Sequence, residues 1–294
     1  MKLWTKFKIN ILPIFKLFLT ICGVLFTACS IALSFATWEE LGLQHIGARI
    51  GVALGIIFVS FLVATLLVLF IFKTSHLWKK GKNEVIAMYG DLLKISFVKN
   101  KKDTRIVVIP VNDTFDTIVE EPSELIKHPL VSSETLHGMW INKFCKEEKI
   151  SPEELNDRIQ KNLKLLECEH TTVKRESGNL ERYPLGSTAV INGSNGVVFY
   201  LFAISSFDEK NNAHVSKREL RESLEKLLQF YYNNGQSKPL FIPLMGTGSS
   251  RAGLSHEQSF KTIKSSILTF DEYITGSVNI VVYKKDRNKV SIFK

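Results

Sequence analysis

The stretch at residues 239–254 reads PLFIPLMGTGSSRAGL. Its first half is an apolar run with the composition of a buried strand, and its second half is a loop rich in glycine and serine. The following residues 255–270 (SHEQSFKTIKSSILTF) repeat apolar side chains at helical spacing, as Phe260 and Ile263 illustrate. A strand, a glycine-rich loop and a helix in this order can cradle phosphate, because loop N–H groups and the positive helix start both attract negative charge.

The loop matches neither of the common phosphate-binding motifs. No Gly-Lys-Ser or Gly-Lys-Thr follows it, as a P-loop requires, and Arg251 stands where the dinucleotide fingerprint has its third glycine. The plain alternative is a tight turn between strand and helix that needs glycine only for its backbone conformation. The loop is therefore a candidate phosphate site whose assignment depends on the rest of the chain.

Strands and helices alternate through the chain after residue 83. Apolar and β-branched runs predict strands at residues 84–89, 92–98, 105–111, 187–192, 197–204, 240–245, 277–283 and 290–293. Periodicity and capping signals predict helices at residues 151–166, 216–232 and 255–270. This alternation predicts an α/β fold with a mostly parallel or mixed sheet, whose ligands bind beyond the carboxyl ends of the strands.

Two long apolar segments precede this region. Residues 17–38 and 50–72 contain no charged residue, and each run reaches the ~20 residues that cross a bilayer core as a helix. We therefore predict a transmembrane hairpin within residues 1–75, with spans at residues 14–38 and 48–72. A cleaved signal peptide is the alternative for the first span, although a second span follows at once.

Lysines flank both apolar segments on their outer sides, whereas the connecting loop carries Glu39, Glu40 and Arg49. Positively charged residues tend to stay on the cytoplasmic side of a membrane. We therefore expect a multi-pass protein of the cell inner (plasma) membrane with both termini in the cytoplasm. Residues 76–83 then form a basic linker, and residues 84–294 form a cytosolic domain.

The formal net charge of +9 would by itself suggest a nucleic-acid partner. Many of the lysines lie beside the apolar segments, so a lipid bilayer explains them better, and we expect no nucleic acid. A basic protein that binds nucleic acid at the membrane surface remains the alternative. The four cysteines show neither metal-ligand spacing nor a disulfide framework, so we expect no metal and a reducing compartment.

Three glycines of the second apolar segment recur every four residues, at Gly47, Gly51 and Gly55. Small residues at this spacing lie on one face and let transmembrane helices pack closely. The alternative is that glycine is simply common in membrane helices.

Four stretches occur in a fixed order along the polar part of the chain. They are GDL at residues 90–92, IVVIPVN at 106–112, SSETLHG at 132–138 and IPLMGTG at 242–248, with YPLGSTAV at 183–190 between the last two. In this order they resemble the stretches of a macro domain, a three-layer α/β/α module with a mixed sheet that binds ADP-ribose. The resemblance covers about residues 83–294.

The resemblance implies a role for each stretch. Asp91 would meet the adenine amino group, Asn112 would face the distal ribose, and the third and fourth stretches would hold the two phosphates. The ligand-binding residues that the resemblance implies are Asp91, Leu92, Asn112, Ser132, Ser133, Leu136, His137, Gly138, Gly246, Thr247, Gly248, Ser249, Ser250 and Arg251.

The chain also departs from the macro-domain pattern. Ile109 stands at the position of an earlier asparagine, residues 132–135 are Ser-Ser-Glu-Thr instead of glycines, His137 replaces an acidic residue, and residues 145–182 look like an insertion. Hydrolytic macro domains need their asparagine and loop geometry to place a water, whereas backbone N–H groups hold phosphate whatever the side chains. We therefore expect a signal-binding protein and no catalytic residue. A membrane-anchored ADP-ribosyl hydrolase or ADP-ribose reader is the alternative.

Each polar candidate also has an ordinary structural explanation. Asp91 follows a glycine as a turn aspartate often does, and Asn112 at a strand end can cap a turn. His137 can be a hydrogen-bonded histidine, and Arg251 can be a solvated surface charge. Ser132 and Ser133 can simply solvate a loop.

Two membrane spans followed by such a domain resemble the membrane–macro effectors of type II Thoeris anti-phage systems. The resemblance implies that a TIR-domain partner protein consumes NAD and makes the ligand, an ADP-ribose derivative such as histidine-ADP-ribose, with no other cofactor. It further implies that the membrane part self-associates in the lipid bilayer and disrupts it, which causes abortive infection.

Overall fold

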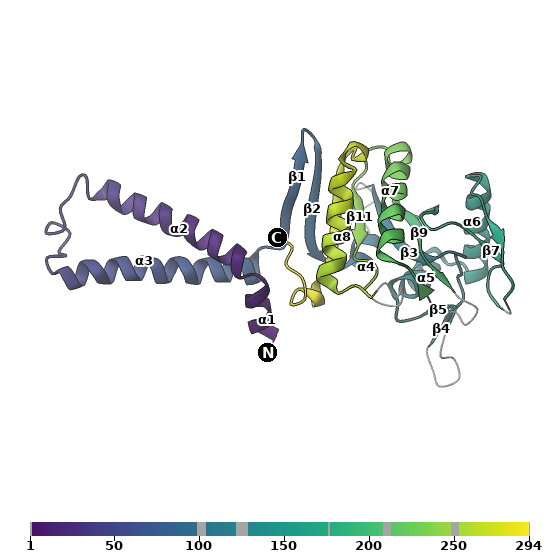
Figure 1. The fold of residues 1–294 in the computed structure, drawn as a ribbon, viewed down its shortest axis with the longest axis horizontal. Coiled ribbons are helices and arrows are strands. Elements are labelled where there is room, and N and C mark those ends of the chain that lie inside the picture. Colours follow the sequence, from purple (N-terminus) through teal and green to yellow (C-terminus); the bar gives the residue numbers. More distant parts are fainter. Residues whose placement is uncertain are drawn as a thin grey trace. The chain divides into compact units, whose positions relative to one another are not determined.

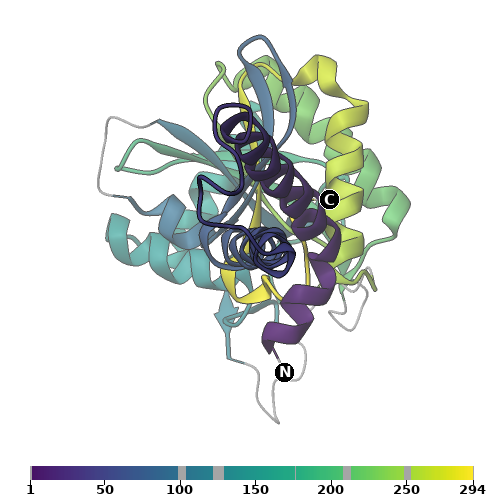
Figure 2. The ribbon, with the colours of Figure 1, turned by 90° about the vertical axis from the view of Figure 1, so that its left-hand side faces the viewer.

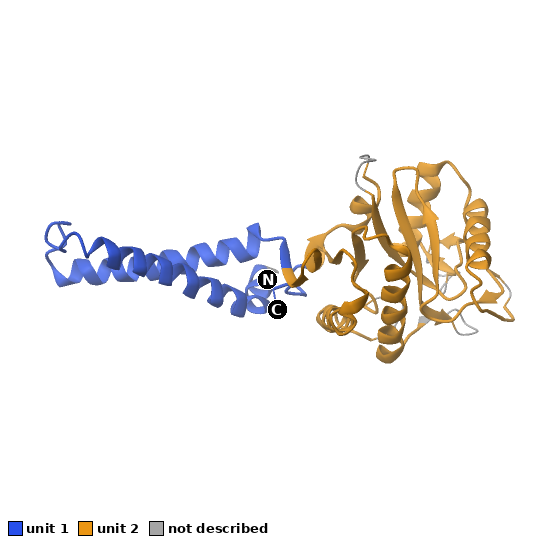
Figure 3. Ribbon diagram, turned by 90° about the horizontal axis from the view of Figure 1, so that it is seen from above, with its two compact units in different colours: residues 1–75, 287–294 blue, residues 76–286 orange. Residues whose placement is uncertain are grey.

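The computed structural model describes residues 2–98, 104–121, 129–175, 177–207, 213–247 and 253–293. The chain divides into two compact units (Figure 3). The helical unit comprises residues 1–75 and 287–294, and the α/β unit comprises residues 76–286. The sequence suggested one domain over residues 84–294, whereas the structure groups the last residues of the chain with the helical unit.

The helical unit contains α1 (Lys2–Ile9), α2 (Ile11–Ala32) and α3 (Ile46–Leu66), which continues as the π-helical turn η1 (Leu67–Ile71). Two stretches, Ile11–Ala32 and Ile46–Ile71, are long and apolar enough to cross a membrane. Most of each stretch is exposed within the protein, unlike the core helix of a soluble protein. The chain thus carries two candidate membrane-spanning helices near its N-terminus.

Both helices begin and end earlier than the spans expected at residues 14–38 and 48–72. After α2 ends at Ala32, the connecting residues form turns. The Thr37 N–H donates to Glu40 Oε2 at 2.7 Å, and the Glu40 N–H donates to Thr37 Oγ1 at 3.3 Å. These side-chain hydrogen bonds compete with continuation of the helix.

Aromatic rings hold α2 and α3 together. The rings of Phe18 and Phe61 meet edge to face with their centroids 5.9 Å apart. The glycines of α3 take no part in this contact, because a Cβ added at Gly47, Gly51 or Gly55 would meet no atom within 4 Å. The small-residue face of α3 is therefore open in the single chain.

The α/β unit is built on one mixed sheet, whose order among the described residues is β1-β2-β12-β11-β3-β9-β10 with β8 paired to β9. The strands are β1 (Thr74–Lys80), β2 (Asn83–Gly90), β3 (Arg105–Asn112), β8 (Thr188–Asn192), β9 (Val197–Phe207), β10 (Ala213–His214), β11 (Leu240–Pro243) and β12 (Ser277–Tyr283). The pairs β2–β12, β12–β11, β11–β3 and β3–β9 are parallel, and β8 and β10 run antiparallel to β9. This arrangement confirms the predicted mixed sheet.

Helices cover both faces of the sheet, so the unit has three layers (Figures 1 and 2). One layer contains α5 (Leu136–Glu148) and α6 (Pro152–Leu165), and the other contains α7 (Lys217–Asn234) and α8 (His256–Thr269). In Figure 2 the green and yellow helices α7 and α8 lie to the right of the strands and the teal helices to the left. The α/β/α architecture predicted from the sequence is confirmed.

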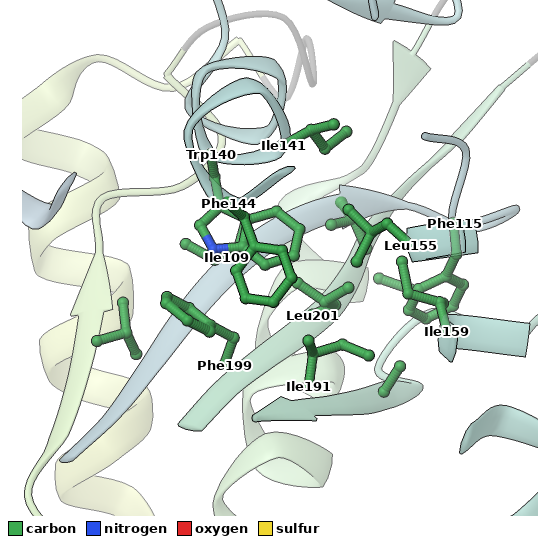
Figure 4. Close-up of a cluster of buried hydrophobic side chains, with 14 of the residues drawn as sticks. Ile109, Phe115, Trp140, Ile141, Phe144, Leu155, Ile159, Ile191, Phe199 and Leu201 are labelled. Carbon is green, nitrogen blue, oxygen red and sulfur yellow. The ribbon is translucent and has the colours of Figure 1, made fainter. Parts of the chain in front are cut away.

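Alternate side chains of β9 face the two layers. Phe199 packs against Trp140 and Phe144 of α5, with ring centroids 5.3 and 5.5 Å away (Figure 4). Its neighbour Tyr200 faces the other layer and meets Phe230 of α7 edge to face. Burial on both faces explains why this strand reads as a continuous apolar run.

The predicted helices of the α/β unit begin where their capping signals lie. Ser151, Ser216 and Ser255 each accept a hydrogen bond from the N–H three residues on, and the acidic or amide side chain at that third position bonds back. Such reciprocal capping satisfies two N–H groups that have no partner within the helix.

Three secondary-structure predictions were wrong. Residues 92–98, predicted as a strand, contain the short helix α4 (Leu92–Ser96), because Asp91 caps its start by accepting a bond from the Lys94 N–H. Residues 76–83, predicted as a linker, mostly form β1 and the turn to β2, where Gly81 has a positive φ of 63°. Residues 290–293, predicted as a strand, are irregular and pack in the helical unit, where Val290 and Ile292 are buried.

Candidate functional site

The parallel strands β2, β12, β11, β3 and β9 end at one edge of the sheet. The segments that follow three of them carry predicted ligand residues: Asp91 after β2, Asn112 at the end of β3, and Gly246 after β11. Ligands of open α/β sheets bind beyond this edge. The fold thus brings three of the predicted stretches to one edge of the sheet.

The loop after β11 is fixed at both ends. Gly246 has a positive φ of 79°, a conformation that side-chain-bearing residues rarely adopt. The Leu254 N–H donates to Gly246 O at 3.3 Å and closes the loop on itself. Gly248, Ser249, Ser250 and Arg251 lie outside the described residues, so their predicted roles stay predictions.

A buried serine of α8 anchors the strand end that leads into this loop. Ser259 Oγ donates to Met245 O at 2.6 Å and accepts from the Met245 N–H at 3.2 Å. Both residues are buried. The two bonds couple the loop entrance to the first turns of α8, so Ser259 is a positioning residue that the sequence did not single out.

The second candidate phosphate segment, residues 132–138, runs from the end of β5 (Val131–Ser132) through a turn into the start of α5. Thr135 caps the helix: its Oγ1 accepts from the Gly138 N–H at 3.1 Å and donates to Ser132 O at 2.8 Å. The backbone N–H of Ser133 already has an acceptor, because it donates to Glu120 O of β4 (Val119–Glu120) at 3.0 Å. The N–H groups of Leu136 and His137, in the first turn, have no acceptor within the helix and are the donors available to an anion.

The residues at this helix start are packed tightly. A Cβ on Gly138 would lie 2.3 Å from Ser132 O, so only glycine fits there. His137 is buried, and burial lowers its pKa to about 3. A neutral imidazole cannot serve as a phosphate cation, so anion binding here depends on backbone N–H groups.

Asp91 and Leu92 have clear structural roles. Asp91 Oδ1 accepts from the Lys94 N–H at 3.3 Å as the cap of α4, and Leu92 is buried in the core beneath it. The turn explanation of Asp91 is therefore observed. Its contact with an adenine amino group stays a prediction.

Asn112 is engaged in a buried polar network. Its Nδ2 donates to Asp116 Oδ2 at 2.8 Å, and its Oδ1 accepts from the Asp116 N–H at 3.0 Å. Asp116 also pairs with Arg175 Nη1 at 3.0 Å and accepts from the Asn179 N–H at 2.7 Å. The turn-capping explanation of Asn112 is observed. Its contact with the distal ribose stays a prediction.

The stretch predicted to be an insertion supplies the other half of this network. The Asn179 Nδ2 donates to the carbonyl oxygens of Thr114 and Phe115 and so holds the turn after β3. Phe115 is buried with a positive φ of 53°, in a region that few non-glycine residues adopt, and its ring meets Tyr183 edge to face. Such strained positions often occur near functional sites.

A second carboxylate, Asp113, is buried beside β9. Its Oδ2 lies 3.1 Å from Arg182 Nε, and its N–H donates to Ser205 O. Burial raises the pKa of Asp113 to about 6, although the Arg182 charge opposes the shift. The sequence shows both aspartates directly after β3, but it does not show which residues pair with them. The partners of Asp116, Arg175 and Asn179, lie 59 and 63 residues further along the chain.

Metal binding has no support within the described ranges, where no three His, Cys, Asp or Glu side chains are grouped so that they could hold an ion.

Comparison with known proteins gives the following matches. A family model described as "Thoeris protein ThsA, Macro domain" matches residues 85–283. The Thoeris protein ThsA of Bacillus amyloliquefaciens (strain Y2) is 27% identical over 252 residues, which cover 83% of this chain and 75% of that protein. Among solved structures, a point mutant of the Oceanobacillus iheyensis macrodomain gives a TM-score of 0.46 at 13% identity, covering 76% of this chain and 94% of that one. The same macrodomain with ADP gives a TM-score of 0.41 at 13% identity, covering 75% and 92%.

Replacing Ser259 with alanine is expected to destabilise the α/β unit. The Met245 N–H and C=O would lose their partner in a buried position, which costs about 1–3 kcal/mol. Urea unfolding of the detergent-solubilised chain, followed by pulse proteolysis, measures the loss. Ser265→Ala is the matched control, because Ser265 is exposed and its hydroxyl donates back to Thr262 O of its own helix. Equal losses in the two variants would contradict the positioning role.

Asp113 is expected to make folding more favourable at acidic pH. Its pKa rises from 3.8 to about 6 in the folded chain, so between these values the folded state holds the proton and the unfolded state does not. This stabilisation is complete below pH 3.8 and is lost as the pH rises through 6, by up to about 3 kcal/mol.

The same urea measurement, made from pH 4 to pH 7, tests this pH dependence. Asp113→Asn should flatten this part of the pH profile, whereas Asp157→Asn, which alters an exposed carboxylate of α6, should leave it unchanged. If the free energy of unfolding of Asp113→Asn changed with pH as steeply as that of the wild type, another group would be responsible for the pH dependence.

Proposed function

The chain belongs to the Thoeris ThsA macro-domain family, and on this premise we propose that it is a membrane-anchored effector whose α/β unit binds an ADP-ribose-derived signal. The family match carries the proposal, because residues 85–283 include both candidate phosphate-binding segments. The family places the protein in anti-phage defence. The identity of the signal and the membrane response are our inferences.

Backbone donors supply the chemistry for a diphosphate. The first N–H groups of α5, at Leu136 and His137, carry partial positive charge at a helix start, and the loop opened by Gly246 leads to the start of α8. Because His137 is neutral, helix starts and loop amides provide the attraction. Such a site can hold a diphosphate even though residues 132–135 are Ser-Ser-Glu-Thr and not glycines.

We propose that the ligand is histidine-ADP-ribose or a related conjugate, made from NAD by a TIR-domain partner. The Thoeris family links the chain to a TIR-derived signal. Asn112 stands at the end of β3, where we propose that it faces the distal ribose. Arg251 is the proposed partner of a carboxylate on the conjugate.

Signal binding fits the site better than hydrolysis. The Asp116 carboxylate accepts from Asn112, Thr114, Asn179 and Arg175, so it is occupied as a structural anion and is a poor base.

ADP-ribosyl hydrolysis is kept as a second candidate function because of Asp113. A carboxylate with a pKa near 6 is suited to general-base chemistry, and Asp113 stands at the carboxyl end of β3. Release of free ADP-ribose from an ADP-ribosylated protein, lost in Asp113→Asn, would favour this candidate.

We place the helical unit in the inner membrane as a two-span hairpin with both termini in the cytoplasm, following the lysine distribution. The open glycine face of α3 supports self-association, since it is not used against α2. Ligand binding would shift the chain toward an assembled state that disrupts the bilayer and leads to abortive infection.

Gly246→Asp is expected to abolish ligand binding. A carboxylate at the loop entrance repels phosphate, and its backbone must adopt a φ of 79°. Titration calorimetry on the solubilised full-length chain, with ADP-ribose and histidine-ADP-ribose, should show affinity lowered at least about a hundredfold, or about 2.7 kcal/mol. Ser265→Asp adds the same charge at an exposed position of α8 and should bind like wild type. Unchanged affinity in Gly246→Asp would refute this site.

Gly51→Leu is expected to prevent assembly without affecting ligand affinity. The leucine fills the face along which two copies of α3 would approach. Cross-linking in lipid vesicles and release of a trapped dye, each with and without histidine-ADP-ribose, measure assembly and membrane damage. Gly23→Leu on α2 is the control, since that glycine is also open to added bulk. Ligand-dependent assembly of Gly51→Leu at the wild-type level would exclude the α3 glycine face.

A further inference from the structure

Asn112 lies where β3 loses its regular pairing with β9. The register of the pair shifts between Val111 and Asn112, where it skips Ile204 of β9. A bulge of this kind bends the strand locally and changes the direction in which a neighbouring side chain points. Asn112 is only 4% exposed, so the orientation of its amide group is set by its protein neighbours.

The carboxylate and backbone of Asp116 fix the two ends of that amide group. The Asn112 Nδ2 donates to Asp116 Oδ2 at 2.8 Å, and the Asp116 N–H donates to Asn112 Oδ1 at 3.0 Å. An amide turned by 180° would place its NH2 group against this N–H and its carbonyl oxygen against the carboxylate. The two bonds therefore hold Asn112 in one orientation.

Arg175 and Asn179 in turn hold Asp116 in place. Asp116 Oδ2 pairs with Arg175 Nη1 at 3.0 Å, and Asp116 Oδ1 accepts from the Asn179 N–H at 2.7 Å. The same Arg175 nitrogen donates to Thr114 Oγ1 at 2.9 Å, and this hydroxyl donates to Asp116 Oδ2 at 2.7 Å. The Asp116 side chain is 1% exposed, so these protein groups take the place of water around its charge.

Gly178 permits the close approach of the backbone to this carboxylate. It has a positive φ of 85°, and a Cβ added there would lie 2.5 Å from Asp116 Oδ1. A side chain at this position would push the neighbouring Asn179 N–H away from its acceptor. The stretch at residues 145–182, which looks like an insertion in the sequence, thus supplies groups that fit around Asp116.

We propose that Arg175 and Asn179 are positioning residues that act through Asp116 to orient Asn112 toward the distal ribose, and so give the site a preference for ADP-ribose compounds over ADP. The inference rests on the proposed function for the presence of such a ligand. Loss of the Arg175 guanidinium removes a donor from Asp116, and the amide group of Asn112 is then held less firmly. Polar groups fixed by a supporting shell of hydrogen bonds recognise a ligand better than mobile ones do.

Titration calorimetry on the solubilised full-length chain tests the proposal with histidine-ADP-ribose, ADP-ribose and ADP. ADP has the same adenosine and two phosphates but lacks the distal ribose. The measured quantity is the affinity of the tighter ribose-bearing ligand divided by that of ADP. A variant that is merely less folded has both affinities lowered by the same fraction, so this ratio does not change.

Arg175→Gln and Asn112→Ala should each lower the affinity ratio about tenfold, since each removes the oriented amide. The double variant should lower it no further than either single variant, because both changes act on one contact. Thr114→Val, which removes only the hydroxyl between Arg175 and Asp116, is the milder variant and should lower the ratio about threefold. Arg158→Gln is the matched control, because Arg158 is an exposed arginine of α6, and it should keep the wild-type ratio.

A wild-type ratio in both Arg175→Gln and Thr114→Val would overturn the proposal. Additive losses in the double variant would also overturn it, since Arg175 would then act by a route other than Asn112. If ADP binds too weakly for a ratio, additivity measured with the ribose-bearing ligand alone decides the question.

The wild-type titrations separate this inference from the proposed function. Equal affinities for ADP and the ribose-bearing ligands would show that the distal ribose is not recognised, which overturns the inference but leaves a nucleotide-binding α/β unit. Binding of none of the three compounds would refute the proposed function, and the inference would fall with it.

Discussion

The site depends on the parallel alignment of five neighbouring strands. Parallel strands place all their carboxyl ends on one edge, and each connection between them must cross back over a face of the sheet. These crossings bring helices to both faces, which buries β3 and β9 on both sides and gives them their continuous apolar sequences. The same alignment gathers the residues after β2, β3 and β11 at one edge, although they are separated by long stretches of sequence.

Features encoded by neighbouring residues were predictable from the sequence. The helices beginning after Ser151, Ser216 and Ser255 have caps and periodicity within one short stretch, and the structure places them there. Local composition gave the wrong secondary structure where a single capping residue or a contact with a distant part of the chain determined it. The cap at Asp91 turned an apolar run into helix α4, and the C-terminal run around Ile292 found its buried surface in the helical unit and not in the sheet.

The candidate site was predictable in its backbone and much less so in its side chains. Glycine positions such as Gly246 and Gly138 are required by a left-handed φ and by a close carbonyl, respectively, and sequence patterns record such needs well. The polar network around Asp116 was missed, since Arg175 and Asn179 come from a stretch that resembled only an insertion. That stretch contributes Asn179, which holds the strained turn at Phe115.

The return of the chain to the helical unit changes how the protein can be divided. In topological terms the α/β unit is inserted into the helical unit and is not appended to it, since residues 1–75 and 287–294 form one body. The α/β unit therefore has two covalent attachments to the helical unit, one at each of its ends. Removing the C-terminal residues alters the helical unit itself, because Ile292 and Phe293 belong to it. Exchange of α/β units between proteins of this architecture would have to preserve both junctions.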